Sequence, residues 1–102
     1  MDRVGQLRRF IESSPHESFP RYALALELKG RGDEAGAAAE LEALLGQAPD
    51  YLAAYLQLGT VLQALGRAAE ARSAFQRGQE LARRKGDTHT LSELTSALDA
   101  LG

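Results

Sequence analysis

Gly32-Asp33-Glu34-Ala35-Gly36-Ala37 and Gly66-Arg67-Ala68-Ala69-Glu70-Ala71 are two versions of one short segment, and they lie 34 residues apart. The same spacing relates further pairs, which are Leu24 and Leu58, Leu28 and Leu62, Leu41 and Phe75, Ala48 and Ala82, and Pro15 and Pro49. A fixed period of this length is typical of architectures in which one helical hairpin stacks on the next. The repeat therefore predicts an all-α fold built from antiparallel helix hairpins.

Helix start and stop signals divide the chain into about six helices. The predicted ranges are a single helix at 2–13, one hairpin at 18–51, a second hairpin at 52–85 and a last helix at 88–101, all within one domain. Asp2, Ser18 and Asp33 are placed to cap three of these helices, because a short polar side chain can accept a hydrogen bond from the first turn. Gly66 is placed to end a helix in the left-handed conformation that glycine adopts at low cost.

The composition is that of a small globular helical protein. The chain has 102 residues, of which 44% are hydrophobic and 25% charged, with a formal net charge of −2. This charge predicts no general affinity for nucleic acid or for an anionic membrane. We expect no membrane span, because no apolar run approaches the roughly 20 residues that a spanning helix needs. Without cysteine there is no disulfide, and the cytoplasm is the expected compartment.

The repeated segments resemble the tetratricopeptide repeat (TPR) family. In the second hairpin the family positions are held by Tyr55, Leu58, Gly59, Leu62, Gly66, Ala71 and Phe75. In the first they are held by Leu24, Ala25, Leu28, Gly32, Ala37, Leu41 and Pro49. Arg21 and Arg83 depart from the pattern, at the usual aromatic and at the usual closing proline. Small residues at the contact points let two helices approach closely, and large residues fill the space beside them.

The two ends of the chain differ from whole repeats. The first helix carries an apolar stripe, Val4, Leu7, Phe10 and Ile11, which lies one repeat length before Ala38, Leu41, Leu44 and Leu45. We therefore interpret it as the second half of a repeat. The last helix carries Leu91, Leu94, Leu98 and Leu101, but has Ser92 and Ser96 where the repeat has leucine. Its single apolar stripe predicts a capping helix.

The resemblance implies a binding surface on the concave face, which the first helix of each hairpin forms. Its positions in this chain are Phe19, Tyr22, Leu26 and Lys29 in the first hairpin, and Ala53, Leu56, Thr60 and Gln63 in the second. Phe19, Tyr22, Leu26 and Leu56 would form an apolar strip for an extended or helical peptide. Two alternatives stay open: the terminal helices bury these residues, or the residues are exposed singly.

These features favour a protein- or peptide-binding adaptor or scaffold with an unidentified partner. The alternative is a structural domain that forms a homodimer through apolar outer faces of its terminal helices, at Val4 or Leu94. One TPR subclass grips chaperone tails with a carboxylate clamp. This clamp is absent, because Tyr22, Leu26 and Gln57 replace its Lys and Asn residues.

No catalytic role is predicted for the chain. Its paired acids lie on helical surfaces, where no cleft is indicated that would separate their pKa values. Neither His16 nor His89 has a His, Cys or Asp companion three or four residues further on, as a metal site on a helix would favour. We therefore expect no enzyme, no cofactor and no metal site.

Overall fold

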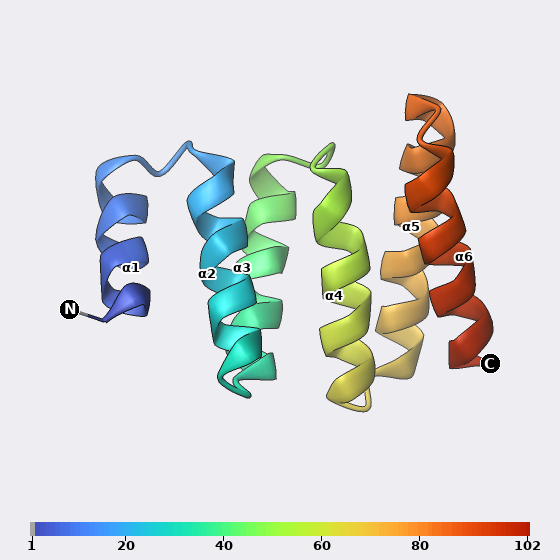
Figure 1. The fold of residues 1–102 in the computed structure, drawn as a ribbon, viewed down its shortest axis with the longest axis horizontal. Coiled ribbons are helices and arrows are strands. Elements are labelled where there is room, and N and C mark those ends of the chain that lie inside the picture. Colours follow the sequence, from blue (N-terminus) through green and yellow to red (C-terminus); the bar gives the residue numbers. More distant parts are fainter. Residues whose placement is uncertain (1) are drawn as a thin grey trace. The chain divides into compact units, whose positions relative to one another are not determined.

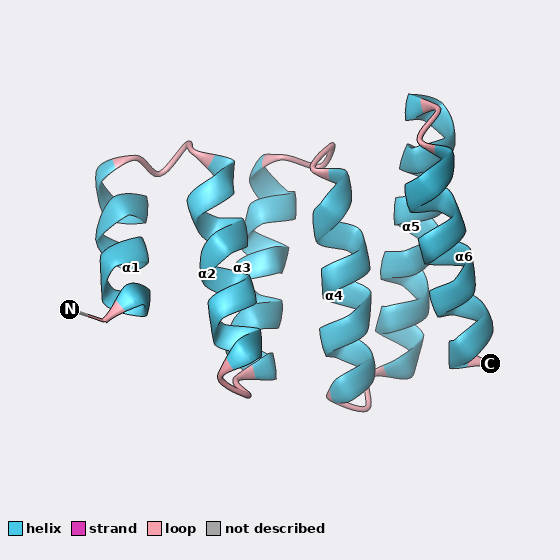
Figure 2. Cartoon of the chain, viewed as in Figure 1, coloured by secondary structure: helices cyan, strands magenta, loops and turns pink. Residues whose placement is uncertain are grey.

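The computed structural model describes residues 2–102, which form six α-helices joined by short turns (Figure 2). The helices are α1 (Arg3–Ser13), α2 (Ser18–Gly30), α3 (Glu34–Gln47), α4 (Leu52–Ala64), α5 (Ala68–Lys85) and α6 (Thr88–Leu101). The predicted all-α fold with six helices is therefore confirmed. The assignment of 18–51 and 52–85 as single repeats stays a prediction, although two helices fall within each range.

The chain divides into two compact units of three helices each. The first ends at Tyr51 and contains α1, α2 and α3, while the second, Leu52–Gly102, contains α4, α5 and α6. In the first unit α2 packs against both α1 and α3 (Figure 1). In the second unit α5 packs against both α4 and α6, and α4 also contacts α6. Each unit is thus an antiparallel hairpin with one additional helix.

Three helices end in the same way, each at a glycine with positive φ. Gly32, Gly66 and Gly86 have φ values of 84°, 77° and 68°. The residue after each glycine donates its backbone N–H to a carbonyl oxygen in the last helical turn; for Asp33 the acceptor is Leu28 O at 2.9 Å. This pattern satisfies carbonyl groups that a helix end otherwise leaves unpaired. The glycines therefore stop the helices and reverse the chain, as predicted for Gly66.

The predicted caps have different outcomes. Asp33 is confirmed, because its side chain accepts the backbone N–H of Gly36 at 2.9 Å. Ser18 is wrong by one residue: it is the first residue of α2, and Glu17 precedes it without a side-chain cap. Asp2 stands at the N-cap position of α1, but its carboxylate accepts from Arg31 instead of capping the helix. Asp2 thus serves a tertiary contact.

The core of the second unit depends on two glycines inside helices. A Cβ built on Gly59 would lie 2.2 Å from Cε1 of Phe75, so the aromatic ring rests directly on the backbone of α4. A Cβ on Gly78 would lie 2.8 Å from Tyr55 Cβ and 3.0 Å from Leu94 Cδ2. Close helix contacts therefore require glycine at both positions, which is the packing that the sequence predicted around Gly59 and Phe75.

The terminal helices contribute little to the buried core. In α2 and α3 the buried apolar residues include Leu24, Ala25, Leu28, Ala37 and Leu41, whereas α1 has no buried residue. In α6 only Leu94 is buried, and it is fully covered. The expectation that Leu94 forms part of an apolar outer face is therefore wrong, because its side chain packs inward near Gly78.

Two glycine substitutions should have opposite effects on stability. Gly59→Ala should destabilise the protein by about 1–3 kcal/mol, since the new methyl group overlaps the Phe75 ring and forces repacking. Gly46→Ala is the matched control on α3, where no atom lies within 4 Å of the added Cβ. It should stabilise the protein by up to about 1 kcal/mol through lower backbone entropy of the unfolded chain. Urea unfolding followed by circular dichroism measures both, and equal effects would contradict the packing described.

Asp87 should make the stability depend on acidic pH. Its carboxylate accepts the backbone N–H of Thr90 at 3.0 Å and the Thr90 hydroxyl at 2.8 Å. The backbone hydrogen bond from Thr90, followed by the hydroxyl, lowers the pKa of Asp87 in the folded protein. Its stabilising effect is therefore complete above the unfolded aspartate pKa of about 3.9 and is lost as the pH falls through the lower folded value.

The corresponding test compares melting temperatures of wild type and Asp87→Asn between pH 6 and pH 2.5. The amide can still accept a hydrogen bond but has no acidic titration, so the variant should lose less stability on acidification. Identical pH profiles would show that Asp87 does not contribute.

Candidate functional site

A groove with a volume of about 450 Å³ lies beside α2 in the first unit. Its lining comes from one face of α2 and from the start of α1, and consists of Arg3, Phe19, Tyr22, Ala23, Leu26, Glu27, Gly30 and Arg31. The α2 residues recur at spacings of three and four, so they form a continuous stripe along that helix. The groove therefore follows the α2 axis for its full length.

Three of the predicted binding residues supply the apolar part of this lining. Phe19 is 66% exposed and Leu26 is 38% exposed. Tyr22 is half-buried, and its ring packs against that of Tyr51 with centroids 5.3 Å apart and planes tilted by 42°. Neighbouring apolar side chains that are exposed together often mark a protein interaction site. This stripe is therefore a candidate contact surface. None of the three is buried by a terminal helix.

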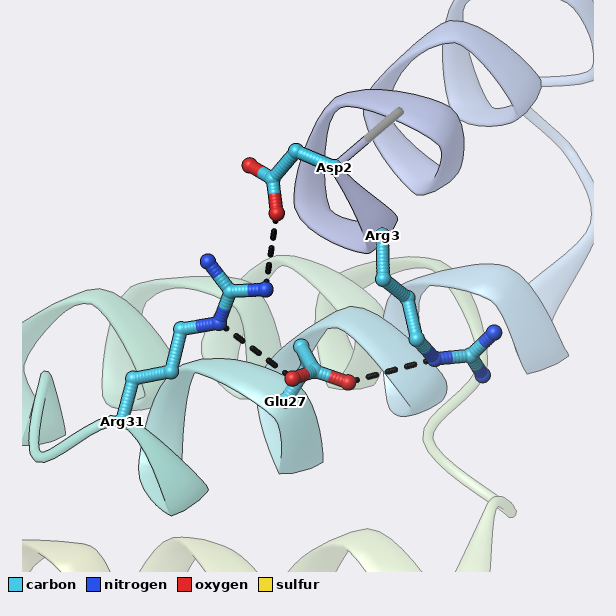
Figure 3. Close-up of polar contacts among 4 residues, drawn as sticks. All are labelled: Asp2, Arg3, Glu27 and Arg31. Atoms are coloured by element: carbon cyan, nitrogen blue, oxygen red, sulfur yellow. Dashed lines mark hydrogen bonds and ion pairs between the residues drawn. The ribbon is translucent and has the colours of Figure 1, made fainter.

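An ion-pair network forms the charged end of the groove (Figure 3). Arg31 Nη2 donates to Asp2 Oδ1 at 2.7 Å, and Arg31 Nε donates to Glu27 Oε2 at 3.3 Å. The other carboxylate oxygen of Glu27 pairs with Arg3 Nε at 3.2 Å. The network connects the start of α1 to the end of α2. It thereby fixes two guanidinium groups beside the apolar stripe.

The same network has an electrostatic effect on its members. The hydrogen bond from Arg31 lowers the pKa of Asp2, so this carboxylate stays ionised to a lower pH than an isolated aspartate. In return, the hydrogen bonds to Asp2 and then to Glu27 raise the pKa of the Arg31 guanidinium. Asp2 and Arg31 thus stabilise each other's charged form.

A second groove of about 440 Å³ lies on another part of the first unit. It is lined by Gly5, Arg8, Arg9, Ile11, Glu12, Arg21, Leu24 and Glu40. Glu40 pairs with Arg21 at 3.3 Å and with Arg8 at 3.7 Å, so two of its arginines already neutralise a carboxylate. With no aromatic side chain in its lining, this groove offers less apolar contact than the one beside α2.

The remaining predicted residues lie outside the α2 groove. Lys29 is half-buried on α2 and does not line it. On α4, in the other unit, Leu56 and Thr60 are half-buried, whereas Gln63 is exposed, as is Ala53. The Thr60 hydroxyl donates to Leu56 O at 2.8 Å, so its oxygen keeps only acceptor capacity for a ligand.

Sequence reasoning did not identify the charged residues of the α2 groove. Glu27 and Arg31 are spaced by four residues on one helix, and this spacing is a recognisable ion-pair signal. Arg3 carries no such signal, because it reaches the groove only through the packing of α1 against α2. The ion pair of Asp2 with Arg31 was not predicted either, because the position of Asp2 before a helix indicated a capping role.

Two further properties of residues 2–102 concern metal ligands and membrane spans. In that part of the chain no three His, Cys, Asp or Glu side chains converge where they could hold a metal ion. None of the helices described there is long and apolar enough to cross a membrane.

The antiparallel hairpins and their glycine contacts define a helical-repeat protein. A family model described as tetratricopeptide repeat matches residues 28–92, which is more than half of the chain. The chain therefore belongs to the tetratricopeptide repeat family. The matched model does not indicate a catalytic family. None of the curated proteins matches this chain significantly.

Solved structures support the same assignment. A tetratricopeptide repeat domain protein from Salinibacter ruber is 35% identical, covers 83% of this chain and 94% of its own, and has a TM-score of 0.78. A protein from Bordetella parapertussis is 27% identical over 99% of this chain and 88% of its own, with a TM-score of 0.85. The TPR2B domain of yeast Sti1, solved in a complex with pHsp70, has a TM-score of 0.90 at 15% identity, with coverages of 96% and 78%. At that identity the yeast domain shows the fold alone.

Proposed function

We propose that this TPR domain is a non-catalytic adaptor or scaffold that binds a protein or peptide partner. The exposed apolar stripe Phe19, Tyr22 and Leu26 carries the proposal, because it lines an open groove next to fixed charges. Apolar contacts would supply most of the binding free energy, and the charged groups would orient the ligand. The cytoplasm is the proposed compartment.

The α4 residues Leu56, Thr60 and Gln63, and Lys29 on α2, are proposed as further contact positions. Leu56 presents a half-exposed apolar side chain, and Gln63 offers both a donor and an acceptor. The pHsp70 partner of the yeast Sti1 domain is not proposed as a partner of this chain. Tyr22 and Leu26 stand where the carboxylate clamp of the chaperone-binding subclass has Lys and Asn, so the charge that holds a terminal carboxylate is missing.

Substitutions at the contact surface should separate binding from stability. Tyr22→Ala and Leu56→Ala should each weaken partner capture while changing the free energy of unfolding by no more than about 1 kcal/mol, because neither side chain is buried. The measurement is quantitative affinity capture from an extract of the native cells, together with urea unfolding of each variant. Ala39→Ser, at an exposed position on α3, is the control. Unchanged capture by both variants, or a loss of several kcal/mol in stability, would refute the proposal.

Self-association is the second candidate function, favoured by one observation. Phe10 on α1 is 53% exposed, which leaves an aromatic ring on the outer surface of a terminal helix. If this ring mediates a symmetric contact, the wild type should dimerise at high concentration and Phe10→Arg should be monomeric. Size-exclusion chromatography with light scattering measures this directly. A wild type that is strictly monomeric at millimolar concentration excludes self-association as the main role.

A further inference from the structure

Around the second groove, the first unit has polar residues at positions where the second unit has buried apolar ones. The 34-residue spacing holds for the helices of both hairpins, because α2 and α4 begin at residues 18 and 52, and α3 and α5 begin at residues 34 and 68. Under this spacing Arg21 corresponds to Tyr55, Glu40 to Ala74 and Gln47 to Leu81. All three residues of the second unit are buried. The repeat itself therefore does not require polar side chains at these positions.

The three polar side chains of the first unit contact one another. Arg21 Nη1 donates to Glu40 Oε1 at 3.3 Å, and Arg21 Nε donates to Gln47 Oε1 at 3.2 Å. Gln47 Nε2 in turn donates to Pro15 O at 2.8 Å, in the turn between α1 and α2. The Arg21 side chain is only 21% exposed. These contacts hold its guanidinium group in one orientation, in which the Nη2 amino group can donate to a ligand.

The second groove also concentrates positive charge in an acidic unit. The first unit contains nine Asp and Glu but only six Lys and Arg, and three of these six, Arg8, Arg9 and Arg21, line this groove. Glu40 pairs with Arg8 at 3.7 Å and with Arg21 at 3.3 Å, so two cations share one carboxylate. Glu12 is the other carboxylate of the lining. Three guanidinium groups against two carboxylates leave the lining with a net charge of +1.

The chemistry of the lining favours a phosphate group as ligand. A guanidinium group can donate two parallel hydrogen bonds to phosphate oxygens, which is why arginine is preferred in phosphate recognition. A carboxylate carries one negative charge, whereas a phosphate monoester carries about 1.5 to 2 at pH 7 and can accept from several guanidinium groups at once. The volume of about 440 Å³ lies within the range of small-ligand sites, roughly 300–1,000 Å³.

We propose that this second groove, named the arginine groove for Arg8, Arg9 and Arg21, binds the phosphate group of a phosphate monoester. Gln47 and Glu40 orient Arg21, and the three guanidinium groups donate to the phosphate oxygens. The ester belongs either to a free metabolite or to a phosphorylated side chain of a partner protein. The arginine groove shares no lining residue with the α2 groove, so its role does not depend on the proposed binding function.

Nuclear magnetic resonance titrations of the full ¹⁵N-labelled chain test this site. The probes are inorganic phosphate, O-phosphoserine and a pentapeptide with one central phosphoserine between glycines, all at an ionic strength held constant with sodium chloride. Each should cause saturable shifts of the Nε–Hε signal of Arg21 and of the backbone amides of Gly5 and Leu24, with Kd in the millimolar range. Tighter binding of the peptide than of O-phosphoserine identifies a phosphorylated partner as the source, and the reverse order identifies a free metabolite.

Substitutions in the arginine groove should change the affinity in opposite directions. Arg21→Gln should weaken phosphate binding about tenfold, because it removes charge-assisted hydrogen bonds. Arg8→Gln should weaken binding several-fold and leaves the contacts of Arg21 with α3 in place. Glu40→Gln should tighten binding about threefold, since the amide can still accept from Arg21 but no longer repels the anion. Glu42→Gln and Arg84→Gln, at exposed positions outside the groove, are the charge-matched controls and should bind like wild type. Circular dichroism verifies that each variant is folded.

Three results would overturn the inference. The first is the absence of saturable shifts at Arg21 and Gly5 with inorganic phosphate at tens of millimolar. The second is an equal effect of the control and groove variants, because net charge would then explain the binding. The third is weaker binding by folded Glu40→Gln, since an anion in this groove must gain from the loss of a neighbouring negative charge. Tyr22→Ala, in the α2 groove, should bind phosphate like wild type, so the partner-capture test of the proposed function stands or fails separately.

Discussion

The contact between the Phe75 ring and the backbone of α4 at Gly59 is the constraint on which the second unit depends. The ring occupies the space that the side chain of any larger residue at position 59 would require. The helices α4 and α5 can therefore approach this closely only because residue 59 has no Cβ atom. Ala25 and Leu41, one repeat length earlier, are both buried in the first unit. Two helices at this distance exclude water from their shared face, and the large neighbouring residues then fill the interior at the density of a folded core.

The packing of neighbouring helices also determines which apolar side chains remain exposed to solvent. An apolar side chain that lies between two neighbouring helices is buried. Leu94 of α6 is an example, because both α4 and α5 pack against α6. In the first unit α2 also packs against two helices, α1 and α3, but the side that carries Phe19 and Leu26 stays partly exposed, as does Phe10 of α1. The candidate site therefore lies on the side of α2 that its neighbours in the first unit leave partly uncovered.

The sequence was sufficient to predict the helices because their signals are local. Glycine turns, the Asp33 cap and the repeated small residues act through backbone conformation and close contact, and they recur at a fixed spacing. The apolar residues of the α2 groove were also predicted, from the resemblance to the family. The charged end of the groove was not, because Arg3 and Asp2 reach it only after α1 has packed on α2. The burial of Leu94 was misjudged for the same reason, since it depends on α4 as well as on α5.

The helix α1 has no buried residue and is connected to the rest of its unit partly through exposed ion pairs from Asp2 and Arg3. A segment held in this way separates from the folded protein at a lower free energy than global unfolding requires. Because Arg3 belongs both to α1 and to the groove, any ligand that contacts it also favours the attached state of α1. Occupancy of the groove and local order of the N-terminal helix are thus thermodynamically linked, and added salt weakens both together.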